Sequence, residues 1–254
     1  MTKLKIISWN INGLRTRFKN KQLDPIFNEN PDILLFQEIK AKYDQLDSEL
    51  KEIPNYNFYI SPAENTRSGG IATFSKIKPN LIKKYFKDPN PKFKSRILNF
   101  NFDGFTLVHI HAPTGIGAKI NLESKLSFYE DLINYTKELV DENVIIAGDF
   151  SIAHNDIDLS DPESAAKSPN FLEDERKFLD ELVNLGFNDA YRLLNQDSQE
   201  YSSWKSAKAR KSNQGFRLDY FFISNSLKES IIETKILSHI EGSKHAPIEL
   251  IIDI

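Results

Sequence analysis

Eight short apolar runs limit the possible folds of this chain more than any other feature of its sequence. Each run is rich in isoleucine, leucine, valine or phenylalanine and is bounded by residues that favour turns. Such runs are typical of strands in sheets that are covered on at least one face. The eight runs are LKIISWN, PDILLFQE, GGIATFS, SRILNFNF, FTLVHIH, NVIIAGDF, RLDYFFIS and IELIIDI. The sequence therefore predicts a protein built around buried sheets.

Two helices are predicted between these runs. The second, in LEDERKFLDELVNLG, ends at Gly186, a residue suited to the position after a helix C-terminus. The first, in NLESKLSFYEDLINYTKELVDEN, has apolar residues close to one helical face, namely Leu122, Leu126, Tyr129, Leu132, Ile133 and Leu139. Strands in hairpin-like groups with helices between them predict an α/β fold in which two mixed sheets pack face to face with helices outside. No long linker or repeat marks a boundary, so residues 1–254 are expected to form a single domain.

Composition narrows the chemistry that is available to the chain. The sequence has no cysteine, which excludes disulfides, thiolate nucleophiles and cysteine-ligated zinc. Any metal must then be held by oxygen or histidine. The net charge of -3 does not indicate binding of polyanions over the whole surface, although positive charge can be confined to one face. The first apolar patch is too short for a signal peptide, and no segment has the length needed to span a bilayer, so a cytoplasmic protein is expected.

Polar residues follow several of the apolar runs, where burial cannot explain them. A single acid at a strand end is usually a turn former or a helix cap. Acids and amides from both halves of the chain together are what a metal-assisted phosphodiesterase needs. Glu38 can hold a hard cation such as Mg²⁺, Asp149 can take a proton from the attacking water, and His245, oriented by Asp219, can donate to a phosphoryl oxygen.

Six segments, in order along the chain, resemble the exonuclease III/AP endonuclease family of DNA-repair phosphodiesterases. They are SWNINGLR, PDILLFQEIK, SGGIATFSK, IIAGDFSIAHNDIDL, GFRLDYFFIS and GSKHAPI. The resemblance covers the chain from end to end. It implies the four-layer α/β sandwich of that family, a Mg²⁺ cofactor that Mn²⁺ can replace, and a monomer that cuts damaged double-stranded DNA on the 5′ side of abasic sites. It also implies a 3′→5′ exonuclease activity.

The resemblance assigns roles to individual residues. Asn10 matches an asparagine near the metal, and Glu38 matches the principal metal-ligand glutamate. Asp149 matches the aspartate that activates the attacking water, and His245 with Asp219 matches the histidine and its orienting acid. Asn12, a further candidate ligand, stands where family members have either aspartate or asparagine.

Several positions depart from the family pattern. His111 replaces a tyrosine and can still donate to a phosphate oxygen over a shorter reach, and Thr114 replaces an amide side chain. Ser151 replaces an asparagine; its hydroxyl can donate one hydrogen bond but is shorter, so it is expected to place the phosphate or the water less firmly. Ala165 and Ser168 stand where the family has asparagines that contact phosphate.

Lys244 stands where the family has an aspartate that contributes to the metal site, and its charge is opposite. These changes leave open a second hypothesis, a family member that binds DNA without efficient cleavage. A third is a phosphodiesterase of the same fold that acts on another phosphoester.

Basic residues interleaved with aromatic ones predict contacts to DNA. The segment SSWKSAKARKSNQGFR combines both kinds, as expected for phosphate contact and stacking, whereas a short charge run is otherwise a solvated loop. By resemblance, Phe216 helps to wall a pocket for an abasic sugar. Trp204 is either an aromatic contact to DNA or a core residue at a strand end. His109, between apolar neighbours, is expected to be a core histidine. The residues expected to contact DNA are Arg15, Arg67, Thr114, Lys208, Arg210, Lys211, Phe216 and Arg217.

Overall fold

The computed structural model describes residues 2–65, 68–86 and 91–254, and Arg67 therefore lies outside the described residues. The first six-stranded sheet has the order β13-β14-β1-β2-β4-β3. Its strands are β1 (Lys3–Asn10), β2 (Ile33–Gln37), β3 (Asn57–Ser61), β4 (Ile71–Ser75), β13 (Ile231–Ile236) and β14 (Ile248–Asp253). Only β1 and β2 are parallel among its pairs, so the sheet is mixed.

The second six-stranded sheet has the order β5-β6-β7-β8-β12-β9. Its strands are β5 (Leu81–Lys83), β6 (Ile97–Phe102), β7 (Phe105–His111), β8 (Val144–Asp149), β9 (Phe187–Asp189) and β12 (Asp219–Ser224). Here β7 and β8 form the parallel pair. Two short strands, β10 (Ser203–Trp204) and β11 (Gly215–Phe216), form a separate ribbon.

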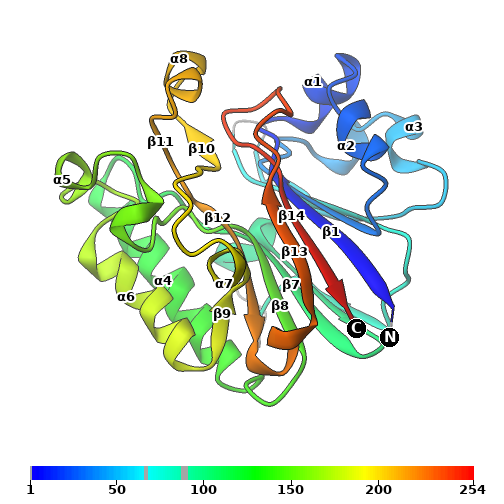
Figure 1. Ribbon diagram of the computed structural model, residues 1–254. Coiled ribbons are helices and arrows are strands. Elements are labelled where there is room, and N and C mark those ends of the chain that lie inside the picture. The colour runs from blue at the N-terminus through cyan, green and yellow to red at the C-terminus, as the bar shows by residue number, and fades with distance from the viewer. Residues whose placement is uncertain (1, 66–67, 87–90) are drawn as a thin grey trace.

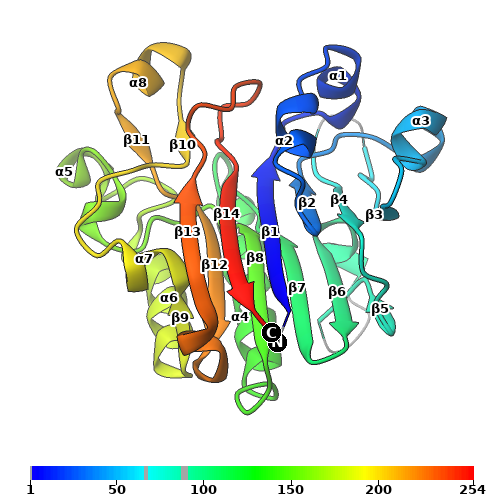
Figure 2. The same cartoon turned by 45° about the vertical axis from the view of Figure 1, so that its right-hand side comes forward.

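Helices cover the outer face of each sheet (Figure 1). The α-helices are α1 (Leu14–Lys19), α2 (Asp24–Asn28), α3 (Ser48–Lys51), α4 (Lys119–Thr136), α5 (Pro162–Ala165), α6 (Glu173–Asn184), α7 (Ala190–Leu194) and α8 (Ala207–Lys211). Short 3₁₀ turns are Tyr43–Gln45, Pro91–Arg96, Asp156–Asp158 and Asn225–Ser230. Figure 2 shows β13, β14, β1 and β2 side by side in front of the second sheet.

Three apolar cores separate the four layers. The central core lies between the sheets and includes Ile6 from β1 and Leu107 from β7. A second core joins β7 and β8 to α4 and α6, and a third joins β1, β2 and β4 to α1, α2 and α3. The inner strands are therefore buried on both faces, which explains why their sequences are continuous apolar runs rather than alternating patterns. The four-layer α/β sandwich expected from the sequence is confirmed.

The strands that the sequence did not predict are mainly at the edges of the sheets. All eight apolar runs form strands, whereas β3, β13, β5 and β9 occupy the four sheet edges. An edge strand is paired on one side only and buries less apolar surface; in β13, alternate residues are exposed or only half-buried. The apolar content of such a strand is too low for a run to stand out. The two strands β10 and β11 are too short to give any pattern.

The helix predictions are confirmed with shifted boundaries. The first predicted helix begins at Lys119, two residues earlier than expected, and ends at Thr136. The second ends as expected, because Gly186 has φ +94° directly after the helix and its N–H reaches the carbonyl of Val183. No helix within the described ranges is long and apolar enough to cross a membrane.

His109 is the core histidine that was expected. It is fully buried on β7, and its ring nitrogens lie 2.8 Å from Gln37 Nε2 and 3.0 Å from Thr73 Oγ1. Burial lowers the pKa of His109 to about 3, so the ring is neutral. Gln37 and Thr73 belong to the first sheet, so the hydrogen bonds of His109 link the two sheets. We therefore assign His109 a structural role rather than a catalytic one.

Candidate active site

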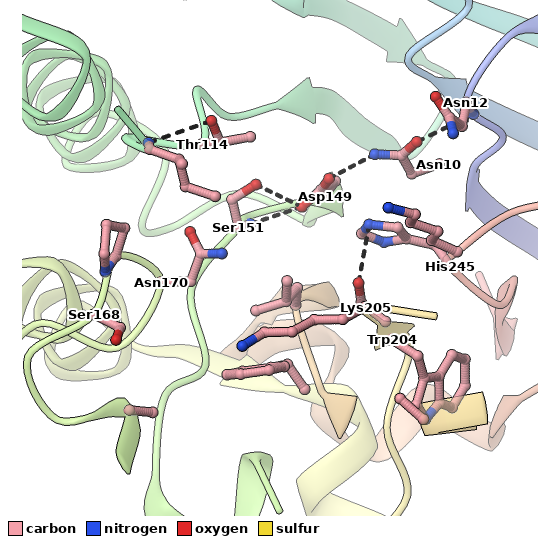
Figure 3. Close-up of a pocket in the computed structure, with 18 of the residues that line it drawn as sticks. Asn10, Asn12, Thr114, Asp149, Ser151, Ser168, Asn170, Trp204, Lys205 and His245 are labelled. Atoms are coloured by element: carbon pink, nitrogen blue, oxygen red, sulfur yellow. Dashed lines mark hydrogen bonds between the residues drawn. The ribbon is translucent and has the colours of Figure 1, made fainter. Parts of the chain in front are cut away.

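One cleft collects the polar ends of strands from both sheets. It has a volume of about 1030 Å³ and lies where β1, β2, β7 and β8 end. Asn10 and Glu38 come from the first sheet, and Asp149 from the second, while His245 lies in the loop before β14. Figure 3 shows Asn10, Asp149 and His245 facing one another in this cleft. The structure thus brings together the strand ends that the sequence singled out.

Asp149 is a buried carboxylate held from two sides. Asn10 Nδ2 donates to Oδ2 at 2.8 Å, while the N–H and the hydroxyl of Ser151 donate to Oδ1 at 2.7 and 3.0 Å (Figure 3). Burial raises the pKa of Asp149, and the charge of Asp219 raises it further, although the hydrogen bonds oppose the shift. A carboxylate with a raised pKa is a better proton acceptor than an ordinary one.

The backbone around Asp149 allows little freedom. Gly148 has φ +143°, and a Cβ at this position would lie 1.9 Å from the carbonyl oxygen of Ile110 on β7. Ser151, two residues after Asp149, has φ +51°, a left-handed conformation that is uncommon for residues other than glycine. Asn12 and Glu38 have similar values, 51° and 55°. Backbone strain of this kind is usually found at functional sites, where surrounding contacts maintain it.

Asp219 and His245 form a hydrogen-bonded pair. Asp219 is directly opposite Asp149 in the β8–β12 pairing, and its Oδ2 lies 2.8 Å from Nδ1 of His245. Since a carboxylate only accepts, Nδ1 carries the proton. Burial alone would lower the pKa of His245, but the Asp219 carboxylate raises it to about 9. The imidazole is therefore a cation at neutral pH.

Two serines complete the surroundings of this pair. The Ser202 hydroxyl donates to Oδ2 of Asp219 at 2.6 Å and accepts the backbone N–H of Leu218 at 3.0 Å. Ser203 Oγ lies 3.1 Å from Nε2 of His245. Ser203 also bridges His245 through the backbone. Together, Ser202 and Ser203 fix both the acid and the ring that it orients.

The oxygens of Glu38 and Asn12 are the candidate metal ligands. They lie beside Lys40, whose ammonium is 3.2 Å from Glu38 Oε2 and donates to Asn12 Oδ1 at 2.5 Å. Glu38 Oε2 is buried without a hydrogen-bond partner among the described residues. Carboxylate and amide oxygens suit a hard cation such as Mg²⁺ or Mn²⁺, so these residues fit a metal site. In this structure the Lys40 ammonium neutralises the charge of the Glu38 carboxylate.

A second group of possible metal ligands overlaps the catalytic candidates. Asp149, Asp219 and His245 each have one ligand atom within 4.8 Å of the other two. Asp219 Oδ1 is buried and has no hydrogen-bond partner in the described part of the chain. This group could also hold a cation, but the Asp219 and His245 atoms that face one another are already hydrogen-bonded.

His111 occupies the cleft as a neutral ring. It is buried, its Nε2 lies 3.5 Å from Glu38 Oε1, and Arg96 donates to its backbone carbonyl at 3.1 Å. Burial and the adjacent Arg96 hold the pKa of His111 well below its ordinary value. A neutral imidazole can donate one hydrogen bond without adding charge. It can thus supply the donor that the family tyrosine provides.

Lys244 lies on the rim of the cleft, and its side chain is exposed. Its backbone is fixed, since its carbonyl accepts the N–H of Trp204 at 3.0 Å and the Ser243 hydroxyl accepts the N–H of His245 at 3.2 Å. Lys244 therefore adds an exposed positive charge to the residues that line the cleft, at a position where the sequence departs from the family pattern.

One of the expected DNA contacts is wrong, and a second is partly engaged within the protein. Arg217 is 1% exposed, and its guanidinium donates to Asp158 at 2.9 Å and to Asp189 at 2.6 Å. It anchors the loop after β8 to β9 and cannot reach DNA. Arg210 is half-buried and donates to the backbone carbonyls of Ser238, Ser243 and Ile240 at distances of 2.7 to 3.1 Å. These donors serve the loop that carries Lys244.

The other expected contacts are placed where a ligand could meet them. Lys208 and Lys211 are exposed on α8, and Arg15 is exposed on α1. Thr114 is exposed in the cleft, and Phe216 is half-buried in its wall. Trp204 combines both expected roles, because it is 4% exposed within the central core and also lines the cleft.

Three residues near the cleft were not found from the sequence. Lys40 carries a signal, since it stands two residues after Glu38 in the quoted segment PDILLFQEIK. Ser203 gives none, because a serine next to a strand is common. Lys125 is fully buried and paired with Glu175 50 residues away in sequence, a partnership that local patterns do not show.

Comparisons with known proteins agree with this geometry. Residues 7–239 match the model of the Endonuclease/Exonuclease/phosphatase family. The exodeoxyribonuclease of Bacillus subtilis is 32% identical over 255 residues, which cover 99% of this chain and 100% of that protein. Recombination repair protein 1 of Drosophila melanogaster is 34% identical, and this chain spans only 37% of its length.

A solved structure extends the likeness to three dimensions. An AP endonuclease from Archaeoglobus fulgidus superposes with a TM-score of 0.89 and 25% identity, covering 99% of this chain and 100% of that one. The family match covers most of the chain, and the Bacillus protein matches along its entire length. The chain therefore belongs to the endonuclease/exonuclease/phosphatase family, and within it to the exonuclease III/AP endonuclease group that its motifs resemble.

Proposed function

We propose that the protein is a metal-dependent DNA-repair nuclease that cuts double-stranded DNA on the 5′ side of abasic sites, and that the same site removes nucleotides from 3′ ends. The observation that carries this proposal is one cleft that is lined by Asp149, Glu38 and His245, with Asp219 hydrogen-bonded to His245 behind it. The similar proteins are named as nucleases and a repair protein, which supports hydrolysis of phosphodiester bonds in DNA as the reaction.

Asp149 is suited to be the general base. Its raised pKa favours proton uptake from a water that attacks phosphorus, and hydrogen bonds from Asn10 and Ser151 keep its oxygens in one orientation. Ser151 is shorter than the family asparagine, but its hydroxyl is used here to hold Asp149. We assign Asn10 and Ser151 to positioning this carboxylate.

His245 is suited to stabilise negative charge on the phosphoryl group. Asp219 fixes the ring and keeps it cationic, with a pKa of about 9. A cation that is already oriented needs no reorganisation as charge develops, which is the usual source of electrostatic catalysis. His111, neutral and buried beside Glu38, provides a further hydrogen-bond donor at the other side of the cleft.

A divalent cation would be held by Glu38 with Asn12, and we propose Mg²⁺, with Mn²⁺ as a substitute, because both prefer oxygen ligands. When bound, such an ion polarises the phosphoryl oxygen and screens its charge. Lys40 donates to Asn12 Oδ1 and forms an ion pair with Glu38, so its ammonium must move aside or share these oxygens with the metal. Lys244 brings a further positive charge to the rim.

DNA is proposed to bind along the exposed basic residues beside the cleft. Lys208 and Lys211 on α8, with Arg15 on α1, can neutralise phosphates on either side of the opening. Phe216 offers an apolar wall at which an abasic sugar can rest. We propose that the protein acts as a monomer, since the cleft is complete within one chain.

Cleavage of a duplex with one stable abasic analogue, in Mg²⁺ and in EDTA, tests this function. We expect cutting on the 5′ side only with the metal, and we expect Asp149→Asn to abolish it. Asp161→Asn is a matched control, because Asp161 is an exposed acid in the same cleft and asparagine can keep its cap on Ser164. Full activity of Asp149→Asn would refute the assignment.

The same assay decides the hypothesis of binding without cleavage. The matched family and the names of the similar proteins give it no support. It requires that the natural protein binds the duplex without cutting and that Lys244→Asp combined with Ser151→Asn restores cutting. Cutting by the natural protein at a rate equal to that of the combined variant excludes it.

A further inference from the structure

A fully buried lysine lies directly behind the cleft. Lys125 on α4 is 0% exposed, and its ammonium lies 2.7 Å from Oε1 of Glu175 on α6, which is also 0% exposed. A buried ion pair contributes little to stability compared with apolar residues of the same size, because two charges must be taken out of water. Stability alone therefore does not explain why the pair is at this position.

The other contacts of Lys125 all lead to segments that line the cleft. Its ammonium donates to the carbonyl of Ser151 at 2.6 Å and to Oδ1 of Asn170 at 3.2 Å, and it lies 3.5 Å from the carbonyl of Thr114. Ser151, Asn170 and Thr114 all line the cleft and come from three different loops. An ammonium has three protons, and here they are directed at Glu175 and these loops.

The contact with Ser151 is the one that reaches the catalytic group. Ser151 has the left-handed φ of +51°, which a residue with a side chain keeps only when its surroundings hold it. Lys125 fixes its carbonyl, while its N–H and its hydroxyl hold Oδ1 of Asp149. A continuous chain of contacts thus runs from Glu175 through Lys125 and Ser151 to the general base.

Neighbouring residues maintain this arrangement. Oε2 of Glu175 accepts the backbone N–H of Leu172 at 3.0 Å, so both of its oxygens have partners. Gly115 lies over the pair with φ +69°, and a Cβ there would come within 3.0 Å of Lys125 Cδ. The turn after Thr114 can therefore lie directly on the Lys125 side chain only because residue 115 is glycine.

We propose that the buried Lys125–Glu175 pair is a positioning device for the reaction, which fixes Ser151 and through it the orientation of Asp149. The inference rests on the proposed nuclease function. Lys125 touches neither substrate nor metal in this role. Its removal should lower kcat more than DNA affinity, because misplacement of a catalytic group by about 1 Å costs on the order of a hundredfold in rate.

The first test is a double variant, Lys125→Met with Glu175→Gln. It removes both charges with little change in volume, and the glutamine can still accept the Leu172 N–H. We expect a folded protein whose affinity for the abasic duplex stays within about twofold and whose kcat falls by roughly 10- to 100-fold. A double variant that folds and keeps the natural kcat overturns the proposal.

The absence of cysteine from the natural chain permits a second test that does not depend on the folding of the double variant. Lys125→Cys has one thiol, which can be alkylated in denaturant before refolding. Treatment with 2-bromoethylamine restores a side chain with an ammonium, and 1-bromopropane gives a neutral side chain of the same length. We expect only the first product to regain kcat, and equal kcat of the two products contradicts the proposal.

A third measurement separates this inference from the nuclease function itself. Amide hydrogen exchange at Ser151 reports the fixed turn without any substrate. We expect exchange at Ser151 to be at least 10-fold faster in the neutral product than in the ammonium product, with Ala147 inside β8 as the unchanged control. Equal exchange at Ser151 refutes the positioning role. If the natural protein fails to cut DNA, the proposed function fails, and this measurement still decides the inference.

Discussion

The Asp219–His245 pair should make the free energy of unfolding depend on pH in a defined window. The pKa of His245 is about 9 in the folded chain, against about 6.5 for an ordinary histidine. This difference corresponds to roughly 3 kcal/mol of stabilisation, since one pKa unit is about 1.4 kcal/mol. Because the folded pKa is the higher one, the stabilisation is fully present below pH 6.5 and is lost as the pH rises through 9.

Asp219→Asn removes the cause of this shift. Without the carboxylate, the pKa of His245 should fall, because burial lowers it and only the charges of Asp149 and Glu38 still raise it. We expect the variant to lose up to roughly 3 kcal/mol relative to the natural protein at pH 6, and to lose much less at pH 9.5. Its cleavage activity at pH 7.5 should also drop, because the ring loses the carboxylate that orients it and favours its cationic form.

Urea unfolding in EDTA at pH 6 and pH 9.5 measures this difference between the two proteins. Groups outside the site cancel in the comparison; Asp149 also responds to the variant, because the charge of Asp219 raises its pKa. Asp180→Asn is a matched control, since Asp180 bonds His154 at 2.9 Å but its side chain is 62% exposed, and an exposed pair is worth at most about 1 kcal/mol. An equal loss of stability for Asp219→Asn at the two pH values would refute the reasoning.

Three further outcomes follow from the geometry. Gly148→Ala should cost at least ~2 kcal/mol of stability, because the added Cβ would lie 1.9 Å from the Ile110 carbonyl; an unchanged urea midpoint would show that β7 and β8 can separate. Arg217→Met should cost ~3–5 kcal/mol in the same assay, since it leaves the buried Asp189 without its cation and Asp158 with Arg192 alone, and a loss below 1 kcal/mol contradicts this. Lys208→Ala with Lys211→Ala should lower DNA affinity and reduce the slope of log affinity against log salt by about 2, with stability within ~0.5 kcal/mol; an unchanged slope would exclude these residues as phosphate contacts.

The sequence predicted the inner strands and the residues at their ends because both are local patterns. An inner strand is covered on both faces, so its composition alone identifies it, and Asn10, Glu38 and Asp149 stand out as polar residues directly after such runs. Edge strands such as β3 and β13 lack this pattern because one side is unpaired. Their positions become evident only once the sheets are assembled.

The roles of individual charged residues could not be predicted from the sequence. Arg217 and Lys208 belong to the same basic segment, yet one is enclosed by Asp158 and Asp189 and the other is exposed. The partners of Arg217 are 59 and 28 residues away in sequence. Lys125 was missed for the same reason, since nothing near it in sequence indicates a buried partner. Whether a cation binds DNA or stabilises the protein depends on contacts that only the fold creates.

The hydrogen bond between Asn10 and Asp149 joins residues 139 positions apart and belongs to the seam between the two sheets. His245 and Asp219 face one another across the same seam. Neither sheet alone contains the complete site, so cleavage of DNA requires that the two sheets are packed against each other. Any partial unfolding that separates the sheets should therefore abolish cleavage, even where the strands within each sheet stay paired.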